Sequence, residues 1–453
     1  MPAAAVAAAS ASARAAAPWG VPASATARRT VNPIRALVDG LALEPNPDKP
    51  VIALSIGDPT IFGNFGPPPE AVAAVRESLD SGRYNGYAPC AGYKEAREAV
   101  ANYVSYPNAE VEFKDVVLCS GCSSALEMCI TALCDPGQNL LVPRPGFALY
   151  RTLAESIGVH IRSYNLMPER GWEADLRHLE QQADARTAAL LINNPSNPCG
   201  SVWRPQHLRD LLQLARRLRL PVIADEIYEH LVFPGERFVP MASLTSEVPI
   251  LSCGGLTKRF MVPGWRMGWI VIHDPIGAFS DEIRKALNML SQRTIGSNTI
   301  VQGALPAILE NKHKTFFEDT SRTLQEHAAL VFGLLSRIEG LRPVMPQGAM
   351  YMMVGLRLQD FPAIACELTF VERLMAEESV FLLPGQCFDF PGYVRLVLTA
   401  PPEQLREACE RIAAFCLRHR QPQPATASAA ADHVGLPFVQ EPRAAAAGGY
   451  GNP

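Results

Sequence analysis

Short apolar runs alternate with helix-like segments through the middle of the chain. Between residues 114 and 271, strand-like runs such as "DVVLCSG", "QNLLVPRP", "AALLINN", "PVIADEIY", "PILSCGG" and "RMGWIVIH" are separated by segments with helical periodicity. In "RPQHLRDLLQLARRLRL" the apolar residues from Leu208 to Leu218 fall on one helical face, and Pro205 stands in the first turn. Apolar strands separated by helices predict a mostly parallel sheet that is covered on both faces.

The flanking segments, 28–100 and about 300–420, follow a different pattern. Helical segments such as "NTIVQGALPAILE" and "TLQEHAALVFGLLSRI" precede the strand-like runs "AMYMMVGL", "SVFLLPG" and "YVRLVLTA", which predicts a smaller α+β unit. We therefore expect an N-terminal arm with part of the small domain in residues 28–75, a large domain in 76–310 and a C-terminal small domain in 311–420.

The two ends of the chain differ in composition from the middle. Residues 1–27 are rich in Ala, Ser and Pro with no acidic residue before Asp39, and residues 421–453 are similar in composition. Such segments bury too little apolar surface to fold alone, so we expect both to be disordered. An acid-free N-terminus with Arg and Ser also fits an organelle transit peptide, but its prolines and sparse arginines favour the first interpretation. We expect a cytoplasmic protein, with the mitochondrion as the alternative.

Composition and charge indicate a globular protein without a charged partner surface. The 453 residues are 48% hydrophobic and 19% charged, which suits a soluble chain of two or three domains. The net charge of −4 favours neither nucleic acid nor a membrane surface as a partner, and no apolar run is long enough to span a bilayer. Eleven cysteines lie mostly in apolar segments, as is typical of free thiols in a reducing compartment. Cys119 and Cys122 form a C-x-x-C, but without a second pair or nearby histidines we expect packing and no metal site.

Polar residues close several predicted strands. "LINNPSNPCG", "VIADEIYEH" and "LSCGGLTK" each carry polar groups at the carboxyl end of an apolar run, which is where ligands bind in parallel sheets. Lys258 follows Gly254, Gly255 and Thr257. Small residues allow a ligand to approach the backbone, and a lysine held there can act as an amine nucleophile. For this stretch alone, a glycine-rich turn with a solvated lysine is an equal alternative.

The polar strand ends, taken in order, carry a family resemblance. "SGCSSA", "PRPGF", "NNPSNPCG", "ADEIY", "GGLTK" and "GWR" resemble the fold-type-I aminotransferases that use pyridoxal 5′-phosphate, over roughly residues 30–415. "NPIRALVD", "SIGDPTIFGNF", "YNGYAPCAGY", "VPGWRMGW" and "GAMYMMVGL" are similar to members that act on tyrosine. The resemblance implies an α/β fold-type-I transferase, with a large domain around a mostly parallel seven-stranded sheet and a smaller α+β domain.

The resemblance assigns the reacting groups. Lys258 would bind the cofactor aldehyde, and its amine, once displaced by substrate, would move the proton of the substrate Cα. Asp225 would hold the pyridine nitrogen in its protonated form; its alternative role is helix capping. Tyr228 and Asn197 would hydrogen-bond the ring 3-oxygen, and Asn197 also faces the substrate carboxylate. The asparagines of "NNPSNP" alone would be read as turn residues.

The phosphate group requires donors and positive charge. The helix after "VVLCSG" would present backbone N–H groups and hydroxyls to an anion, although serine N-capping satisfies the same geometry. Many relatives have a serine three residues before the lysine; this chain has Gly255, so the missing hydroxyl would come from Thr257 or Ser252. The expected phosphate ligands are Cys122, Ser123, Ser124 and the bidentate Arg266.

The remaining expected residues concern the ring face, the substrate and a second subunit. Phe147 would stack on the cofactor ring, with an ordinary core position as the alternative. Arg395 would grip the substrate α-carboxylate beside Gly57, since an arginine in an apolar strand is hard to explain structurally. Tyr87 would reach the phosphate of a neighbouring subunit, which implies a homodimer with shared active sites. Arg293 would bind the distal carboxylate of an acceptor across the subunit boundary, or only form a subunit salt bridge.

These expectations define a transaminase that moves the amino group of tyrosine and related amino acids to a 2-oxo acid, such as 2-oxoglutarate or pyruvate, in a ping-pong reaction. Its partners are small molecules, with no nucleic acid, membrane or metal. The alternatives are a broad alanine and aromatic aminotransferase or a C–S β-lyase on the same scaffold. A cofactor-binding regulator would need an appended domain that the low-complexity ends do not offer.

Overall fold

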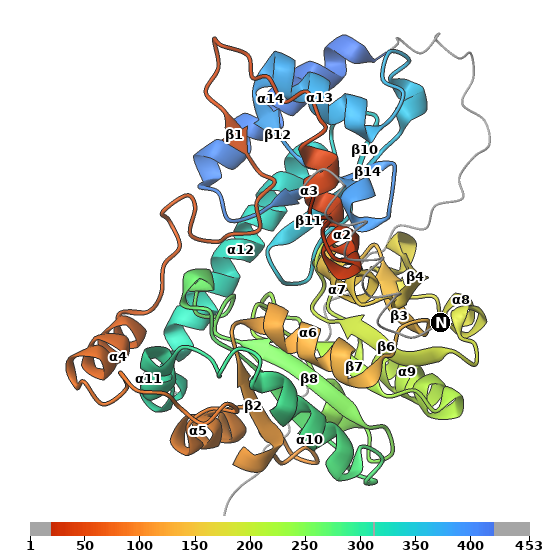
Figure 1. Ribbon diagram of the computed structural model, residues 1–453. Coiled ribbons are helices and arrows are strands. Elements are labelled where there is room, and N and C mark those ends of the chain that lie inside the picture. The colour runs from red at the N-terminus through yellow and green to blue at the C-terminus, as the bar shows by residue number, and fades with distance from the viewer. Residues whose placement is uncertain (1–19, 311–312, 421–453) are drawn as a thin grey trace, which may run out of the picture. The chain divides into compact units, whose positions relative to one another are not determined.

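The computed structural model of the chain describes residues 20–310 and 313–420, which form one compact unit (Figure 1). Two segments were predicted to be disordered, residues 1–27 and 421–453. Of these, residues 1–19 and 421–453 lie outside the described residues. At the end of the first segment, Ser24 caps helix α2 (Ala25–Arg29) by accepting a hydrogen bond from the N–H of Ala27. Because this cap satisfies a free donor at the helix start, regular structure begins before the boundary predicted at residue 27.

The large sheet is mostly parallel, as predicted. Its strand order is β2-β9-β8-β7-β6-β3-β4-β5, and the antiparallel pairs are those of β9 with β2 and β8 and of β5 with β4. Seven strands were predicted; the eighth, β5, has only two residues, too few to produce an alternation pattern. The strands are β2 (Val116–Cys119), β3 (Asn139–Arg144), β4 (His160–Met167), β5 (Glu173–Ala174), β6 (Thr187–Asn193), β7 (Val222–Asp225), β8 (Ile250–Gly255) and β9 (Gly268–His273).

Helices cover both faces of this sheet because its strands are apolar on both sides. Leu140 and Val142 of β3 belong to the core cluster that includes α6 and α7, whereas Leu141 between them belongs to the cluster that includes α9. This alternation follows from the two-residue period of a strand. The helices around the sheet are α4 (Pro69–Asp80), α5 (Lys94–Val104), α6 (Cys122–Leu133), α7 (Leu149–Ser156), α8 (Leu176–Gln182), α9 (Pro205–Leu218), α10 (Ser280–Ser291) and α11 (Thr299–Leu309).

A smaller antiparallel sheet, in the order β10-β11-β14-β13, lies above the large sheet in Figure 1, and α12 extends from one to the other. Ile52 of β1 pairs with Val380 of β12, so the N-terminal arm joins the C-terminal part of the chain. The domain boundaries given above stay a prediction, because the contacts hold the described residues together as one unit. The elements are α3 (Pro33–Val38), β1 (Ile52–Ala53), α12 (Lys314–Leu335), β10 (Leu341–Pro343), β11 (Tyr351–Leu356), α13 (Glu367–Glu378), β12 (Val380–Phe381), β13 (Leu383–Pro384), β14 (Tyr393–Val397) and α14 (Pro402–His419).

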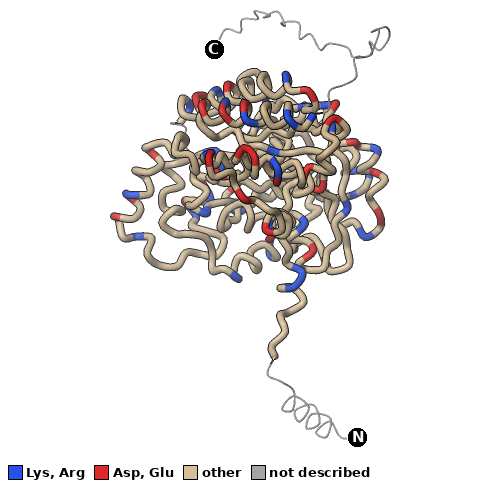
Figure 2. The backbone as a smooth tube through the Cα atoms, turned by 90° about the horizontal axis from the view of Figure 1, so that it is seen from above, with Lys and Arg blue, Asp and Glu red and all other residues tan. Residues whose placement is uncertain are grey.

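The distribution of charged residues and the state of the cysteines agree with what the composition predicted. Lys and Arg are interspersed with Asp and Glu along the described chain in Figure 2. Among the described residues, no helix is long and apolar enough to cross a membrane. All eleven cysteines are free thiols, and the sulfur of Cys119 lies 3.8 Å from the sulfur of Met128. The C-x-x-C therefore packs in the core.

We predict that the apolar face of α9 is a main contributor to stability. Leu211 is fully buried, so Leu211→Ala should lower the free energy of unfolding by about 2–5 kcal/mol through lost burial and a cavity. Leu417 on α14 is 77% exposed, and Leu417→Ala should change the free energy of unfolding by less than about 0.5 kcal/mol. Urea titration of both variants measures the difference; equal values would show that α9 is loosely packed.

Candidate active site

A cavity of about 590 Å³ opens beyond the carboxyl ends of the central parallel strands. Its floor comes from the ends of β6 and β7 and the segment after β8, and its other walls come from the small sheet and the N-terminal arm. This is the edge of the sheet at which the sequence predicted a ligand. The predicted residues that line it are Gly57, Cys122, Ser123, Phe147, Asn197, Asp225, Tyr228, Lys258, Arg266 and Arg395.

Lys258 is held by the backbone around it. Its Nζ donates a hydrogen bond of 2.5 Å to the carbonyl oxygen of Gly57 and lies 5.9 Å from the centre of the Tyr228 ring. A Cβ at Gly255 would stand 2.7 Å from the carbonyl oxygen of Met267. The serine of many relatives therefore has no room at position 255, because the obstacle is backbone.

Asp225 is a buried carboxylate that has no cation beside it. The residue ends β7 and is 3% exposed. Its Oδ2 accepts a 2.6 Å hydrogen bond from the hydroxyl of Tyr150, and Oδ1 accepts weaker ones from the Ile227 N–H and the Cys122 thiol. Burial raises the pKa of Asp225 to about 6 although these three donors lower it. The described residues give this carboxylate only these three donors and no ion pair, so a cation within the cavity would complete its environment.

Arg395 is the opposite case, a buried guanidinium without a carboxylate. It donates to the Asn197 Oδ1 at 2.9 Å and to the Ser55 carbonyl oxygen, while its Nε has no partner. Burial lowers the pKa of Arg395, and the neighbouring Tyr351 and Tyr228 hydroxyls partly oppose this. A desolvated cation requires an anion, and no carboxylate of the described residues contacts Arg395. A substrate carboxylate would meet this requirement.

A cradle for an anion lies at the start of α6. Gly121 adopts a φ of +78° at the N-cap, and a Cβ there would collide with the guanidinium of Arg266, which donates to the Ser120 carbonyl oxygen at 3.2 Å. Cys122 and Ser123, the first residues of the helix, line the cavity. Ser124 does not, and its N–H already donates to the Gly121 carbonyl oxygen, because it is one residue deeper in the first turn.

Of the two residues expected to supply the hydroxyl that Gly255 lacks, only Thr257 lines this cavity. The Oγ1 of Thr257 is buried without a hydrogen-bond partner and the residue lines the cavity. Ser252 lines a separate small cavity on the other side of the strand. Together with the helix start and Arg266, Thr257 forms a donor set that suits a phosphate group.

The residues present fit pyridoxal 5′-phosphate. The anion cradle, the carboxylate of Asp225 and the side chain of Phe147 all line this one cavity. The amine of Lys258 faces the same space. Buried polar groups normally have partners. The Asp225 carboxylate without a cation and the Thr257 hydroxyl without a hydrogen bond therefore indicate that a polar ligand binds here.

Besides Ser124, two predicted residues do not line this cavity. Tyr87 is 87% exposed, and Arg293 is also exposed. Among the lining residues that were not predicted from the sequence are Arg35, Tyr150 and Tyr351. Tyr150 stands one helical turn after Phe147, a spacing that could have indicated it.

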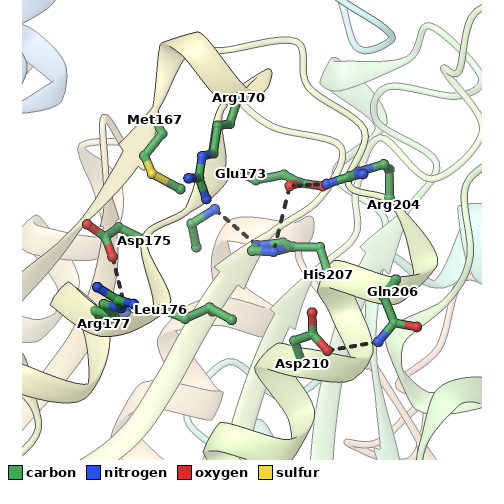
Figure 3. A pocket seen from close by; sticks show the side chains of 11 residues that line it. Met167, Arg170, Glu173, Asp175, Leu176, Arg177, Arg204, Gln206, His207 and Asp210 are labelled. Atoms are coloured by element: carbon green, nitrogen blue, oxygen red, sulfur yellow. Dashed lines mark hydrogen bonds and ion pairs between the residues drawn. The ribbon is translucent and has the colours of Figure 1, made fainter.

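A second cavity, of about 540 Å³, lies at the outer edge of the sheet, away from these groups. Figure 3 shows that its charges satisfy one another: both Arg204 and His207 point toward Glu173. His207 accepts a hydrogen bond from the N–H of Ala174, and burial lowers its pKa. This cavity holds no unpaired buried charge of the kind found around Asp225 and Arg395.

Comparisons with known proteins agree with the geometry. The family model of aminotransferase class I and II matches residues 49–412. Tyrosine aminotransferase from Mus musculus is 53% identical over 401 residues, covering 88% of each chain, and an S-alkyl-thiohydroximate lyase from Arabidopsis thaliana is 37% identical, covering 82% of this chain and 81% of its own. The crystal structure of tyrosine aminotransferase from Leishmania infantum superposes with a TM-score of 0.84 at 34% identity, covering 89% of this chain and all of the other. The predicted fold and family are confirmed: the chain belongs to the class I and II aminotransferases, enzymes that depend on pyridoxal 5′-phosphate.

Proposed function

We propose that this aminotransferase transfers the amino group of tyrosine to a 2-oxo acid such as 2-oxoglutarate. One observation carries the proposal: a single cavity joins the Lys258 amine, the unpaired Asp225 carboxylate and the unpaired Arg395 guanidinium. An amino acid brings the α-carboxylate that Arg395 lacks. The tyrosine aminotransferases among the relatives support the choice of donor.

Each residue then has a defined task. Arg395 and Asn197 fix the α-carboxylate, which sets the position of Cα, and the Lys258 amine takes the proton from Cα and returns it. Tyr228 donates to the ring 3-oxygen, and Asp225 holds the ring nitrogen protonated. When bound, pyridoxal 5′-phosphate supplies an aldehyde that carries the amino group and a ring that withdraws electrons from Cα.

The cavity also suits a ring at the side-chain end of the substrate. Ile34 and Val38 of α3, together with Phe381 and Leu383 after α13, form an apolar wall. Apolar and aromatic lining favours an aromatic donor over a charged one. The same arm places one cation, Arg35, in this wall; it is exposed and makes no ion pair with the described residues.

Arg35 is the candidate ligand for the distal carboxylate of a dicarboxylic acceptor. The cations that line the cavity are Arg35, Lys258, Arg266 and Arg395, and the other three have tasks already. Arg293, proposed from the sequence, requires a second subunit to reach this position.

We further propose a homodimer in the cytoplasm. Tyr87 and Ile295 are 87% and 56% exposed on adjoining loops, since Gly296 lies against the backbone of Cys90. Large exposed side chains on neighbouring loops are typical of an interface, and Tyr87 would there reach the partner's phosphate. The eleven free thiols support a reducing compartment.

Lys258→Ala is expected to abolish transamination of tyrosine with 2-oxoglutarate, because no other amine of the described residues lines the cavity. The purified variant should also lack the visible absorption of the wild-type protein. Lys314→Ala, whose side chain is 80% exposed on α12, is the matched control and should stay fully active. A fully active Lys258→Ala protein would refute the proposed function. Release of pyruvate and ammonia from a cysteine conjugate without any acceptor would favour the lyase alternative.

Arg35→Ala is expected to raise the apparent KM for 2-oxoglutarate about 10- to 100-fold, because a hydrogen bond to a charged group contributes about 1.5–3 kcal/mol. Pyruvate, which lacks the distal carboxylate, and tyrosine should change little. Steady-state kinetics of Arg35→Ala and Arg293→Ala with both acceptors separate the two candidates. The reverse pattern, with only Arg293→Ala selective for 2-oxoglutarate, would assign the distal carboxylate to Arg293; equal losses for all substrates would show a structural role.

A further inference from the structure

Tyr351 connects three parts of the site that come from different regions of the chain. It begins β11, is 1% exposed and lines the cavity. Its Oη lies 2.8 Å from the Oη of Tyr228, which follows β7 of the large sheet. Its ring lies 4.4 Å from the guanidinium carbon of Arg395 on β14. A Cβ at Gly57, in the N-terminal arm, would stand 2.5 Å from the same hydroxyl.

The strand register fixes the contact with Arg395. Tyr351 pairs with Val397 and Met353 with Arg395, so Tyr351 and Arg395 are diagonal neighbours on one face of the small sheet. The rings of Tyr351 and Phe388, the latter at 4.9 Å, both lie against the guanidinium. Aromatic faces stabilise a cation without using its N–H groups. The two rings therefore hold Arg395 in place without using the N–H groups that its bonds to Asn197 and Ser55 leave free for a carboxylate.

Either hydroxyl could donate in the hydrogen bond between Tyr228 and Tyr351. The role of Tyr228 in the proposed function decides which one does, so this step rests on that function. A phenol carries one proton. If Tyr228 gives its proton to the ring 3-oxygen, Tyr351 must be the donor in the bond between the two hydroxyls. A hydroxyl that accepts a hydrogen bond becomes a stronger donor itself. Burial raises the pKa of Tyr228, so its proton stays on the hydroxyl through the neutral range.

We propose that Tyr351 is a positioning residue with two separable parts: its hydroxyl strengthens Tyr228 as a donor to the ring 3-oxygen, and its ring holds Arg395 for the substrate α-carboxylate. The competing view is that Tyr351 only fills the core between the two sheets. A core filler would affect stability and leave the pH dependence of the cofactor spectrum unchanged.

Two substitutions separate the parts. Tyr351→Phe keeps the ring and removes the hydroxyl, whereas Tyr351→Leu removes both. The matched control is Tyr164→Phe, because Tyr164 is fully buried and its hydroxyl donates to the Leu191 carbonyl oxygen outside the cavity. Each protein is loaded with pyridoxal 5′-phosphate and measured in three ways: the pH midpoint of its visible absorption, the Kd for 3-(4-hydroxyphenyl)propionate, and the thermal midpoint. The ligand 3-(4-hydroxyphenyl)propionate carries the carboxylate but has no amino group, so it binds without reacting.

The expected pattern is a split. The pH midpoint reports the loss of a proton that is shared with the ring 3-oxygen. The hydrogen bond from Tyr228 stabilises the cofactor most after this proton has left, because the oxygen is then more negative. A weaker Tyr228 donor therefore raises the pH at which the proton leaves. Tyr351→Phe should raise the midpoint by roughly 0.5–1 pH unit and leave the Kd within about twofold. Tyr351→Leu should raise the midpoint equally and weaken the carboxylate about 3- to 30-fold. Tyr164→Phe should change neither.

An unchanged pH midpoint in Tyr351→Phe would overturn the hydroxyl part, and equal Kd values for Tyr351→Phe and Tyr351→Leu would overturn the ring part. If all three variants lower only the thermal midpoint, Tyr351 is a core residue and the inference is wrong. A wild-type protein that shows neither a pH-dependent visible band nor carboxylate binding would instead refute the proposed function, and the inference with it.

Discussion

A carboxylate buried at the end of a central strand, without a cation, is the constraint on which the site depends. Removing the charge of Asp225 from water costs several kcal/mol unless it is paired. The Tyr150 hydroxyl, the Ile227 N–H and the Cys122 thiol offset part of this cost, but the pKa is still raised to about 6. These donors fix the orientation of the carboxylate without neutralising it. The protein is therefore prepared for a ligand that brings positive charge to this point.

The second unpaired ion, Arg395, has the opposite sign and lies on the small sheet. Each of the two charges matches a different partner: a protonated ring nitrogen for Asp225 and an α-carboxylate for Arg395. Lys258, hydrogen-bonded to the arm through Gly57, faces the same cavity. Because the two charges belong to different sheets, their separation depends on how the small sheet and the arm pack on the large one. Tyr351, which contacts Tyr228, Arg395 and Gly57, stands at that junction.

Much of the fold and of the site could be predicted from the sequence, because it depends on the local pattern of apolar and polar residues. Apolar runs that end in polar residues predicted the parallel sheet and placed Lys258, Asp225 and Asn197 at one edge. Tyr351 could not be found in this way, since it lies in the otherwise apolar strand β11 and only the tertiary fold turns its hydroxyl toward the site. The choice of Thr257 over Ser252 depends on which cavity each residue lines, and this is set by the tertiary fold. The two-residue strand β5 is too short for any periodicity. The roles proposed for Tyr87 and Arg293 require a second subunit, which local pattern does not describe.

The most direct test of the account concerns the ring nitrogen that Asp225 is arranged to receive. Pyridoxal 5′-phosphate labelled with ¹⁵N in its ring can be bound to the wild-type protein and its nitrogen chemical shift recorded by NMR at pH 7.5. The account predicts a protonated ring nitrogen, because a buried carboxylate beside it stabilises the positive charge. An unprotonated ring nitrogen under these conditions would contradict it, since Asp225 would then be a buried charge with no partner in the active site.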